Sequence, residues 1–216
     1  GTTSDQLASA SVNAHHNAVL NPKAQFHREL TIEQVRKSHL VADPLHALDC
    51  SPIGDGAAAV IITGRNLSDR NRSVRVLASS VSSDCPGLGQ RKSLTELRAT
   101  RMSAQKAYEQ AGIGPGDIDV AEVDDCFTIS HLLAVEDLGL RKKGEAAHAI
   151  STVVNSSGGL KAGGNPVVAV WFYQVGEITP QLRCDAGRRQ ISKRRFGLTH
   201  DVSGTGVISV VHILGR

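Results

Sequence analysis

From residue 73 onward, short runs rich in Val, Ile and Leu alternate with longer amphipathic segments. The apolar runs predict strands at residues 74–81, 118–123, 151–154, 196–200 and 206–214. The segments between them predict helices at residues 93–112 and 127–138. A third helix is predicted after the loop at residues 155–166 and ends near residue 182. The resulting order, β-α-β-α-β-α-β-β, is typical of an α/β fold with helices on both faces of a mostly parallel sheet. The closing hairpin makes the predicted sheet mixed.

Capping residues support the helix predictions. Thr31 with Gln34 and Ser93 with Glu96 both have the spacing of a capping box, in which the two side chains satisfy free backbone N–H groups. Gly112 follows the last apolar position of the second of these segments, as a helix-ending glycine should.

The first 72 residues have a different character. They are mainly polar and predict helices over residues 6–17 and from 31 to 43, followed by a buried strand at 57–63 and a linker at 64–73. The histidines of this region follow no repeated metal-ligand spacing and are expected at surface or loop positions: His15, His16, His27, His39 and His46.

The amino-acid composition argues against several classes of binding partner. The 24 basic and 21 acidic residues nearly balance, and aromatic residues make up only 3% of the chain, which argues against a nucleic-acid surface. No apolar run approaches the ~20 residues of a membrane span. The four cysteines form no CxxC pair, so we expect no zinc site, no disulfide scaffold and a reducing, cytoplasmic location. The first residue is Gly, which favours a piece of a longer chain.

Residues 155–166 form a glycine-rich loop between the predicted strand at 151–154 and the helix behind it. Four glycines in twelve residues let the backbone adopt positive φ and approach a ligand closely. Such a loop also leaves N–H groups free at a helix start. A tight strand-to-helix turn is the simpler interpretation, and the motifs around the loop favour a functional one.

Four segments, in order along the whole chain, resemble motifs of the thiolase family. Residues 50–59 resemble the S-P-x-S-D-G-A-A-A strand, and residues 119–127 resemble the H-D-C-F segment of sterol-carrier-protein-type and archaeal thiolases. Residues 155–166 resemble the N-P-S-G-G-x-x-x-x-G-H-P loop, and residues 198–206 resemble the T-H-N-x-G-G-x-G turn.

The resemblance implies a domain organisation. The thiolase fold has two similar β-α-β-α-β-α-β-β halves and an inserted loop domain. By resemblance, residues 1–50 are the helical end of the loop domain, residues 51–66 carry the last strand of the first half, and residues 73–216 are the complete second half. The rest of the first half, with the nucleophilic Cys of the family, has no counterpart here. We therefore expect a homodimer or a complementing N-terminal half as partner, and a strand at 57–63 that lacks sheet partners.

The resemblance also implies a chemistry. Thiolases make or break a carbon–carbon bond between two acyl-CoA units, so the expected substrate is a coenzyme A thioester, with no covalently bound cofactor and no metal. The acid/base thiol of the family corresponds to Cys126. This residue begins a predicted helix, where the helix dipole favours a thiolate.

Two imidazoles of the family motifs are replaced. The first residue of H-D-C-F is Asp124, and the His of G-H-P is Asn165. Asn165 can donate an amide N–H but cannot act as a base, and an ionised Asp124 repels a developing oxyanion. The loss of one oxyanion donor costs roughly a hundred- to a thousandfold in rate. His200, beside the last glycine turn, is either a spare imidazole or a structural residue.

By the same resemblance, the loop and the final turn supply the expected substrate and CoA contacts, at Ser157, Gly158, Gly159 and Gly204. Three functions stay open at this point. The chain is the impaired or incomplete segment of a thiolase-like acyltransferase, a non-catalytic thiolase-like structural or partner subunit, or a thiolase-like aldolase on CoA thioesters with Tyr173 as its acid/base group.

Overall fold

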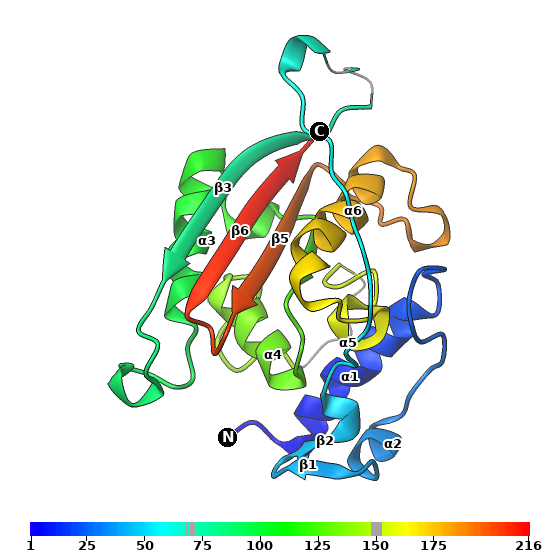
Figure 1. Ribbon diagram of the computed structural model, residues 1–216, viewed down its shortest axis with the longest axis vertical. Coiled ribbons are helices and arrows are strands. Elements are labelled where there is room, and N and C mark those ends of the chain that lie inside the picture. Colours follow the sequence, from blue (N-terminus) through cyan, green and yellow to red (C-terminus); the bar gives the residue numbers. More distant parts are fainter. Residues whose placement is uncertain (68, 70–71, 148–152) are drawn as a thin grey trace.

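A computed structural model describes residues 1–67, 69, 72–147 and 153–216 (Figure 1). Its main sheet has the strand order β3-β6-β5-β4. The strands are β3 (Arg75–Ser83), β4 (Val120–Val123), β5 (Phe196–Ser203) and β6 (Ile208–Gly215). β4 and β5 are parallel, whereas β6 is antiparallel to both β3 and β5. The predicted α/β fold with a mixed sheet is therefore confirmed.

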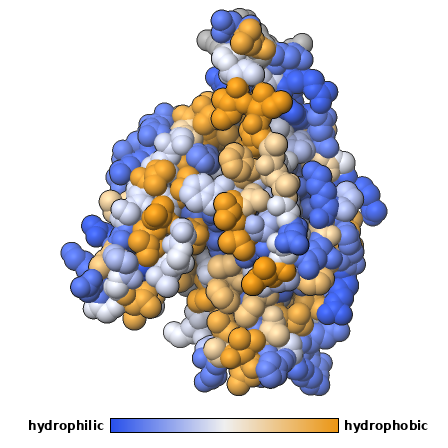
Figure 2. Space-filling view, viewed as in Figure 1, coloured by the Kyte–Doolittle hydropathy of each residue, from blue (hydrophilic) through white to orange (hydrophobic). Residues whose placement is uncertain are grey.

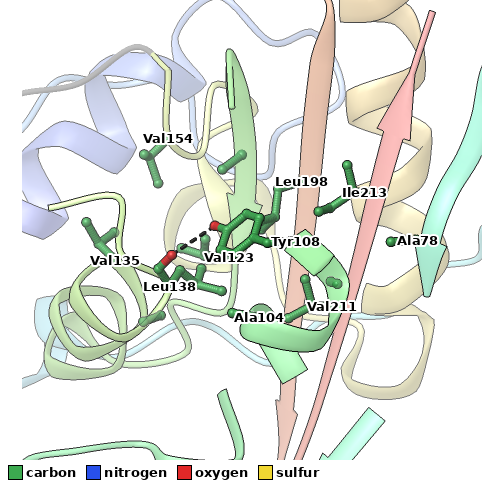
Figure 3. Packing of buried hydrophobic residues seen from close by; sticks show 13 residues of the cluster. Ala78, Ala104, Tyr108, Val123, Val135, Leu138, Val154, Leu198, Val211 and Ile213 are labelled. Carbon is green, nitrogen blue, oxygen red and sulfur yellow. Dashed lines mark hydrogen bonds between the residues drawn. The ribbon is translucent and has the colours of Figure 1, made fainter. Parts of the chain in front are cut away.

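The alternation of side chains along each strand gives the sheet two buried faces. One face packs against α3 (Arg98–Ala111) and α4 (Thr128–Asp137), and the other against α6 (Val170–Arg183). Figure 3 shows the first core, where Tyr108 lies among aliphatic side chains and its hydroxyl donates to the Leu138 carbonyl at 2.8 Å. Helices thus cover both faces.

The first 50 residues form a separate layer below the sheet in Figure 1. It contains α1 (Ser4–Ala18), α2 (Ile32–Arg36) and a small hairpin, β1 (Leu40–Ala42) with β2 (Leu45–His46). Short 3-10 helices lie at Ala47–Asp49, Arg65–Leu67, Leu88–Gln90, Pro115–Asp117, Val167–Ala169 and Gly187–Arg189.

The Thr31–Gln34 capping box is confirmed, but other local predictions need correction. α2 ends at Arg36 and not near residue 43, which lies in the turn of the small hairpin. His15 is 1% exposed and stacks on Phe26, so its predicted surface position is wrong.

The predicted start of α3 at residue 93 is also wrong. The helix begins at Arg98, because the Leu97 N–H donates to the Asp137 carboxylate at 2.6 Å. The Ser93 hydroxyl accepts from the N–H of Thr95 and caps no helix. Tertiary contact with α4 thus sets the start of α3.

The predicted strand before the glycine-rich loop differs from the structure. Of the strand at 151–154, residues 151 and 152 lie outside the described residues, and Val154 forms an isolated parallel bridge with Ala121. The loop itself holds a short helix, α5 (Gly159–Gly163).

Residues 57–63 are extended but belong to no strand, so the predicted buried strand is wrong. Ile61 is 90% exposed and Ile62 is 80% exposed. Figure 1 shows this segment passing α6, and Figure 2 shows hydrophobic residues along its course. A strand needs a neighbour to pair with, and the described residues supply none here.

Among the described residues, no helix has the length and the apolar character needed to cross a membrane.

Replacement of Ile61 by Ala should change the free energy of unfolding by less than about 0.5 kcal/mol, because the side chain is already in water. Ile213→Ala is the matched control: the same change at a side chain that is 0% exposed should cost about 2–5 kcal/mol. Urea unfolding measures both. A comparable loss at Ile61 would contradict this placement and show that the segment is packed in solution.

Candidate active site at the carboxyl ends of β4 and β5

The predicted site residues lie at one edge of the sheet. β4 and β5 are parallel, so their carboxyl ends meet, and Val123 is paired with His200. The chain continues from β4 with the Asp124 N–H donating to the His200 carbonyl at 2.9 Å. The structure thereby brings Asp124, Cys126 and His200 to the edge where the glycine-rich loop also lies.

Asn155 fixes the glycine-rich loop to the end of β4. Its side-chain oxygen accepts the Val123 N–H at 2.7 Å and its amide donates to the Val123 carbonyl at 3.1 Å. Asn155 itself has a φ of 52°, a left-handed conformation that Asn adopts more readily than most residues. Asp125 adds a second tie, because its carboxylate accepts the Leu160 N–H at the start of α5, at 2.6 Å.

The loop residues expected to contact substrate are buried. The Ser157 hydroxyl donates to Glu122 at 2.5 Å, and the Ser157 N–H donates to the same carboxylate at 3.1 Å. Gly158 and Gly159 lie beside it with φ of 99° and 60°. Gly204, with φ of 62°, lies apart from them in the exposed turn between β5 and β6.

Cys126 is partly buried, two residues before α4. Its N–H donates to the Asp124 carboxylate at 3.1 Å, and its sulfur lies 3.8 Å from the Ser130 hydroxyl. Burial, then the charge of Asp124, raises the pKa of this thiol well above its usual range. The expected thiolate is therefore wrong: burial and the neighbouring carboxylate outweigh the helix dipole, and the thiol keeps its proton at neutral pH.

Asn165 is connected to Cys126 by two hydrogen bonds that pass through Ser51. The Asn165 amide donates to the Ser51 hydroxyl at 3.0 Å, and the Ser51 N–H donates to the Cys126 carbonyl at 2.8 Å. The side-chain oxygen of Asn165 accepts the Val167 N–H at 3.0 Å. An amide has two N–H donors, so Asn165 retains one for a further acceptor.

His200 points away from this group. Its ring is fully buried and its Nε2 lies 2.9 Å from the Thr100 hydroxyl on α3. Its Nδ1 has no hydrogen-bond partner among the described residues. Burial lowers the pKa of His200 to about 4, so the ring is neutral at physiological pH. The contact with α3 favours the structural alternative for this residue.

The sequence analysis did not single out the buried carboxyl groups of Glu122 and Asp201. Burial raises the pKa of Glu122 to about 8, and burial with the charge of Asp124 raises the pKa of Asp201 to about 8. A signal for Asp201 does exist in the sequence, because it stands where the T-H-N motif has Asn. Among the described residues, no three His, Cys, Asp or Glu side chains are arranged to hold a metal ion.

Comparison with known proteins places the chain among thiolases. The family described as "Thiolase C-terminal domain-like" matches residues 80–216. The "Acetyl-CoA acetyltransferase" of Methanothermobacter thermautotrophicus is 46% identical and is aligned with the whole chain. The "Sterol carrier protein 2" of Rattus norvegicus is 34% identical over 98% of the chain. The chain spans 59% of the first of these relatives and 41% of the second.

The solved structure described as "Ltp2-ChsH2(DUF35) aldolase" superposes on the whole chain with a TM-score of 0.83. The two sequences are 23% identical. The chain spans 59% of that protein. At this identity the likeness supports the fold alone.

Gly159→Ala should be more destabilising than Gly204→Ala, although both residues have φ near 60°. The left-handed backbone costs each variant about 1–2 kcal/mol. At Gly159 the new methyl group also collides with Asp125 and Asn155, whereas at Gly204 its nearest neighbour is 3.8 Å away. We expect at least about 1 kcal/mol of additional loss at Gly159 in urea unfolding. Equal losses would mean that the loop is not held against β4.

Alkylation should distinguish the cysteines. Because the thiolate is the reactive form, iodoacetamide at pH 7.5 should modify exposed Cys184 at least about tenfold faster than Cys126. Peptide mass spectrometry over time measures both rates in one sample. Faster reaction at Cys126 would contradict a protonated thiol, and equal rates in urea would confirm that the native fold causes the difference.

Proposed function

Since the chain belongs to the thiolase family, we propose that it is the C-terminal segment of an acyltransferase that acts on acyl-CoA thioesters, of the acetyl-CoA acetyltransferase type. Residues 1–50 would be the end of the loop domain, 51–66 the end of the first half and 73–216 the second half. The observation that carries the proposal is the hydrogen-bonded chain from Cys126 through Ser51 to Asn165. These hydrogen bonds bring together three of the family motifs, at residues 50–59, 119–127 and 155–166.

In this function the protonated Cys126 would serve as the acid. A thiol with a raised pKa is protonated at neutral pH, so it holds a proton that it can pass to a leaving group. The remaining N–H of Asn165 would donate to the thioester oxygen as it gains negative charge. Ser157, Gly158 and Gly159 would shape the site from beneath, and Gly204 would border it.

The nucleophile would come from a complementing N-terminal half. The chain covers only 59% of its acetyltransferase relative. Residues 57–63 expose a row of β-branched and apolar side chains, and no strand in the described part of the chain pairs with them. A strand from that N-terminal half would pair with this segment and remove its free edge. A second copy of the chain is the other candidate for this role. With free cysteines throughout, we place the reaction in the cytoplasm, without a nucleic-acid or membrane partner.

An aldolase on CoA thioesters is a second candidate, and one observation favours it. The Tyr173 hydroxyl is buried and has no hydrogen-bond partner among the described residues. It faces Gly163, where a β-carbon would lie 2.9 Å from the hydroxyl oxygen. Burial raises the pKa of Tyr173, so it would act as a proton donor.

Cleavage of acetoacetyl-CoA by the chain together with its complementing half should fall about a hundredfold or more in Cys126→Ala, as expected for a lost acid/base group. Cys184→Ala is the matched control, because Cys184 is exposed on the end of α6, and it should keep full activity.

Cleavage that survives Cys126→Ala would remove Cys126 from the mechanism. Absence of CoA-thioester binding in calorimetry of the complex would overturn the enzyme and leave a non-catalytic subunit. Retro-aldol cleavage of a β-hydroxyacyl-CoA that is lost in Tyr173→Phe would favour the aldolase.

A further inference from the structure

Asp124 and Asp201 lie side by side at the edge of the sheet. The parallel register pairs Glu122 with Thr199 and Val123 with His200, so the next position on each chain brings the two aspartates together on one face. The hydrogen bond from the Asp124 N–H to the His200 carbonyl keeps this register beyond the end of β4. Their placement is therefore a consequence of strand pairing.

Both side chains are buried, Asp124 at 5% and Asp201 at 6% exposure. No Lys or Arg of the described residues forms an ion pair with either one. The register places the two carboxyl groups beside each other in a buried site. Two buried carboxylates this close cannot both be ionised, so we infer that one proton is held between the two groups. Burial and the charge of Asp124 correspondingly raise the pKa of Asp201 to about 8.

The pair adjoins Cys126, because Asp124 Oδ1 accepts the Cys126 N–H at 3.1 Å. Since the thiol keeps its proton at neutral pH, it cannot accept another, and the oxygen of the pair that carries no proton is the available acceptor at this edge. It also occupies two motif positions at once: Asp124 replaces the His of H-D-C-F and Asp201 replaces the Asn of T-H-N. The two departures thus lie side by side at the end of the paired strands.

We propose that Asp124 and Asp201, sharing one proton, are the acid/base pair that moves the α-proton of the CoA thioester, in place of the missing imidazole. This proposal rests on the function proposed above. When the enolate forms, the C–H bond of the α-carbon breaks and its proton goes to the unprotonated oxygen of the pair. The electron pair of that bond becomes the enolate, with its charge on the thioester oxygen. In the reverse direction, the pair returns the proton to carbon.

The shared proton can be tested in the chain without any substrate. The folded pair holds its proton up to about pH 8, whereas an unfolded Asp releases it near pH ~3.9. The folded state therefore binds the extra proton between these values, and stability falls as pH rises through that window.

Other groups around the pair also titrate. On the same face of the sheet, burial raises the pKa of Glu122 to about 8, which gives a slope of the same sign. Burial lowers the pKa values of His200, on the opposite face of β5, and of His212, on β6, which gives the opposite sign. Cys126 stays protonated, and Glu177 on α6 is ion-paired with Arg189. Only a comparison of variants isolates the pair.

In Asp201→Asn, the amide N–H can donate to Asp124, so the pair needs no titratable proton. In Asp124→Asn, the new amide can donate to Asp201 in the same way. Urea unfolding at pH 5 and pH 8.5 should show that wild type loses at least about tenfold more in its folding equilibrium constant than either variant. Asp185→Asn is the control, because this exposed residue pairs with Arg72 far from the pair, and it should keep the wild-type slope. Equal slopes in wild type and both Asn variants would overturn the shared proton.

The catalytic role needs a second readout. In the complex with the complementing half, exchange of acyl-CoA α-protons with D₂O should fall about a hundredfold or more in Asp201→Asn, with thioester binding unchanged in calorimetry. If Asp201→Asn kept full α-proton exchange but lost the dependence of stability on pH, the catalytic role would be overturned and the shared proton would be structural only. No exchange in wild type would overturn the acyltransferase and the catalytic role together, while the pH slope would still report the pair.

Discussion

The parallel pairing of β4 with β5 is the constraint on which the site depends. β4 is the last strand of the sheet, so its outer N–H and carbonyl groups need partners once they are buried. Val154 supplies one bridge, to Ala121, and the Asn155 amide then pairs with both backbone groups of Val123. The glycine-rich loop is held where it is because its first residue completes the sheet.

Burial of carboxyl groups is the second physical theme of this edge. Asp125 accepts a hydrogen bond from the Leu160 N–H, and Glu122 accepts from the hydroxyl and the N–H of Ser157, so the donors that contact both carboxyl groups are neutral. Burial still raises the pKa of Asp125 to about 7 and that of Glu122 to about 8. The edge therefore retains protons near neutral pH, which suits chemistry that passes a proton between carbon and a side chain.

The sequence predicted those helix ends that depend only on neighbouring residues. The Thr31–Gln34 box and the left-handed Gly112 after α3 need only neighbouring residues, and both were predicted. The start of α3 depends on Asp137, 40 residues away, and the state of residues 57–63 depends on a partner strand, so neither could be read from nearby residues. The motifs predicted where the candidate site lies, but the raised pKa of the Cys126 thiol depends on its burial, which the sequence does not show.

The two aspartates change the chemistry only as a pair. With Asn at position 201, an amide N–H would satisfy a charged Asp124 and no proton would be bound. With Asp at both positions, two buried carboxylates that the strand register places side by side cannot both ionise at neutral pH. On the proposal made above, the second Asp therefore makes the pair a proton-binding group, beside a thiol that burial and the charge of Asp124 keep protonated. If the pair acts as proposed, the replacement of the motif His by Asp124 keeps proton transfer at the site and assigns it to different atoms.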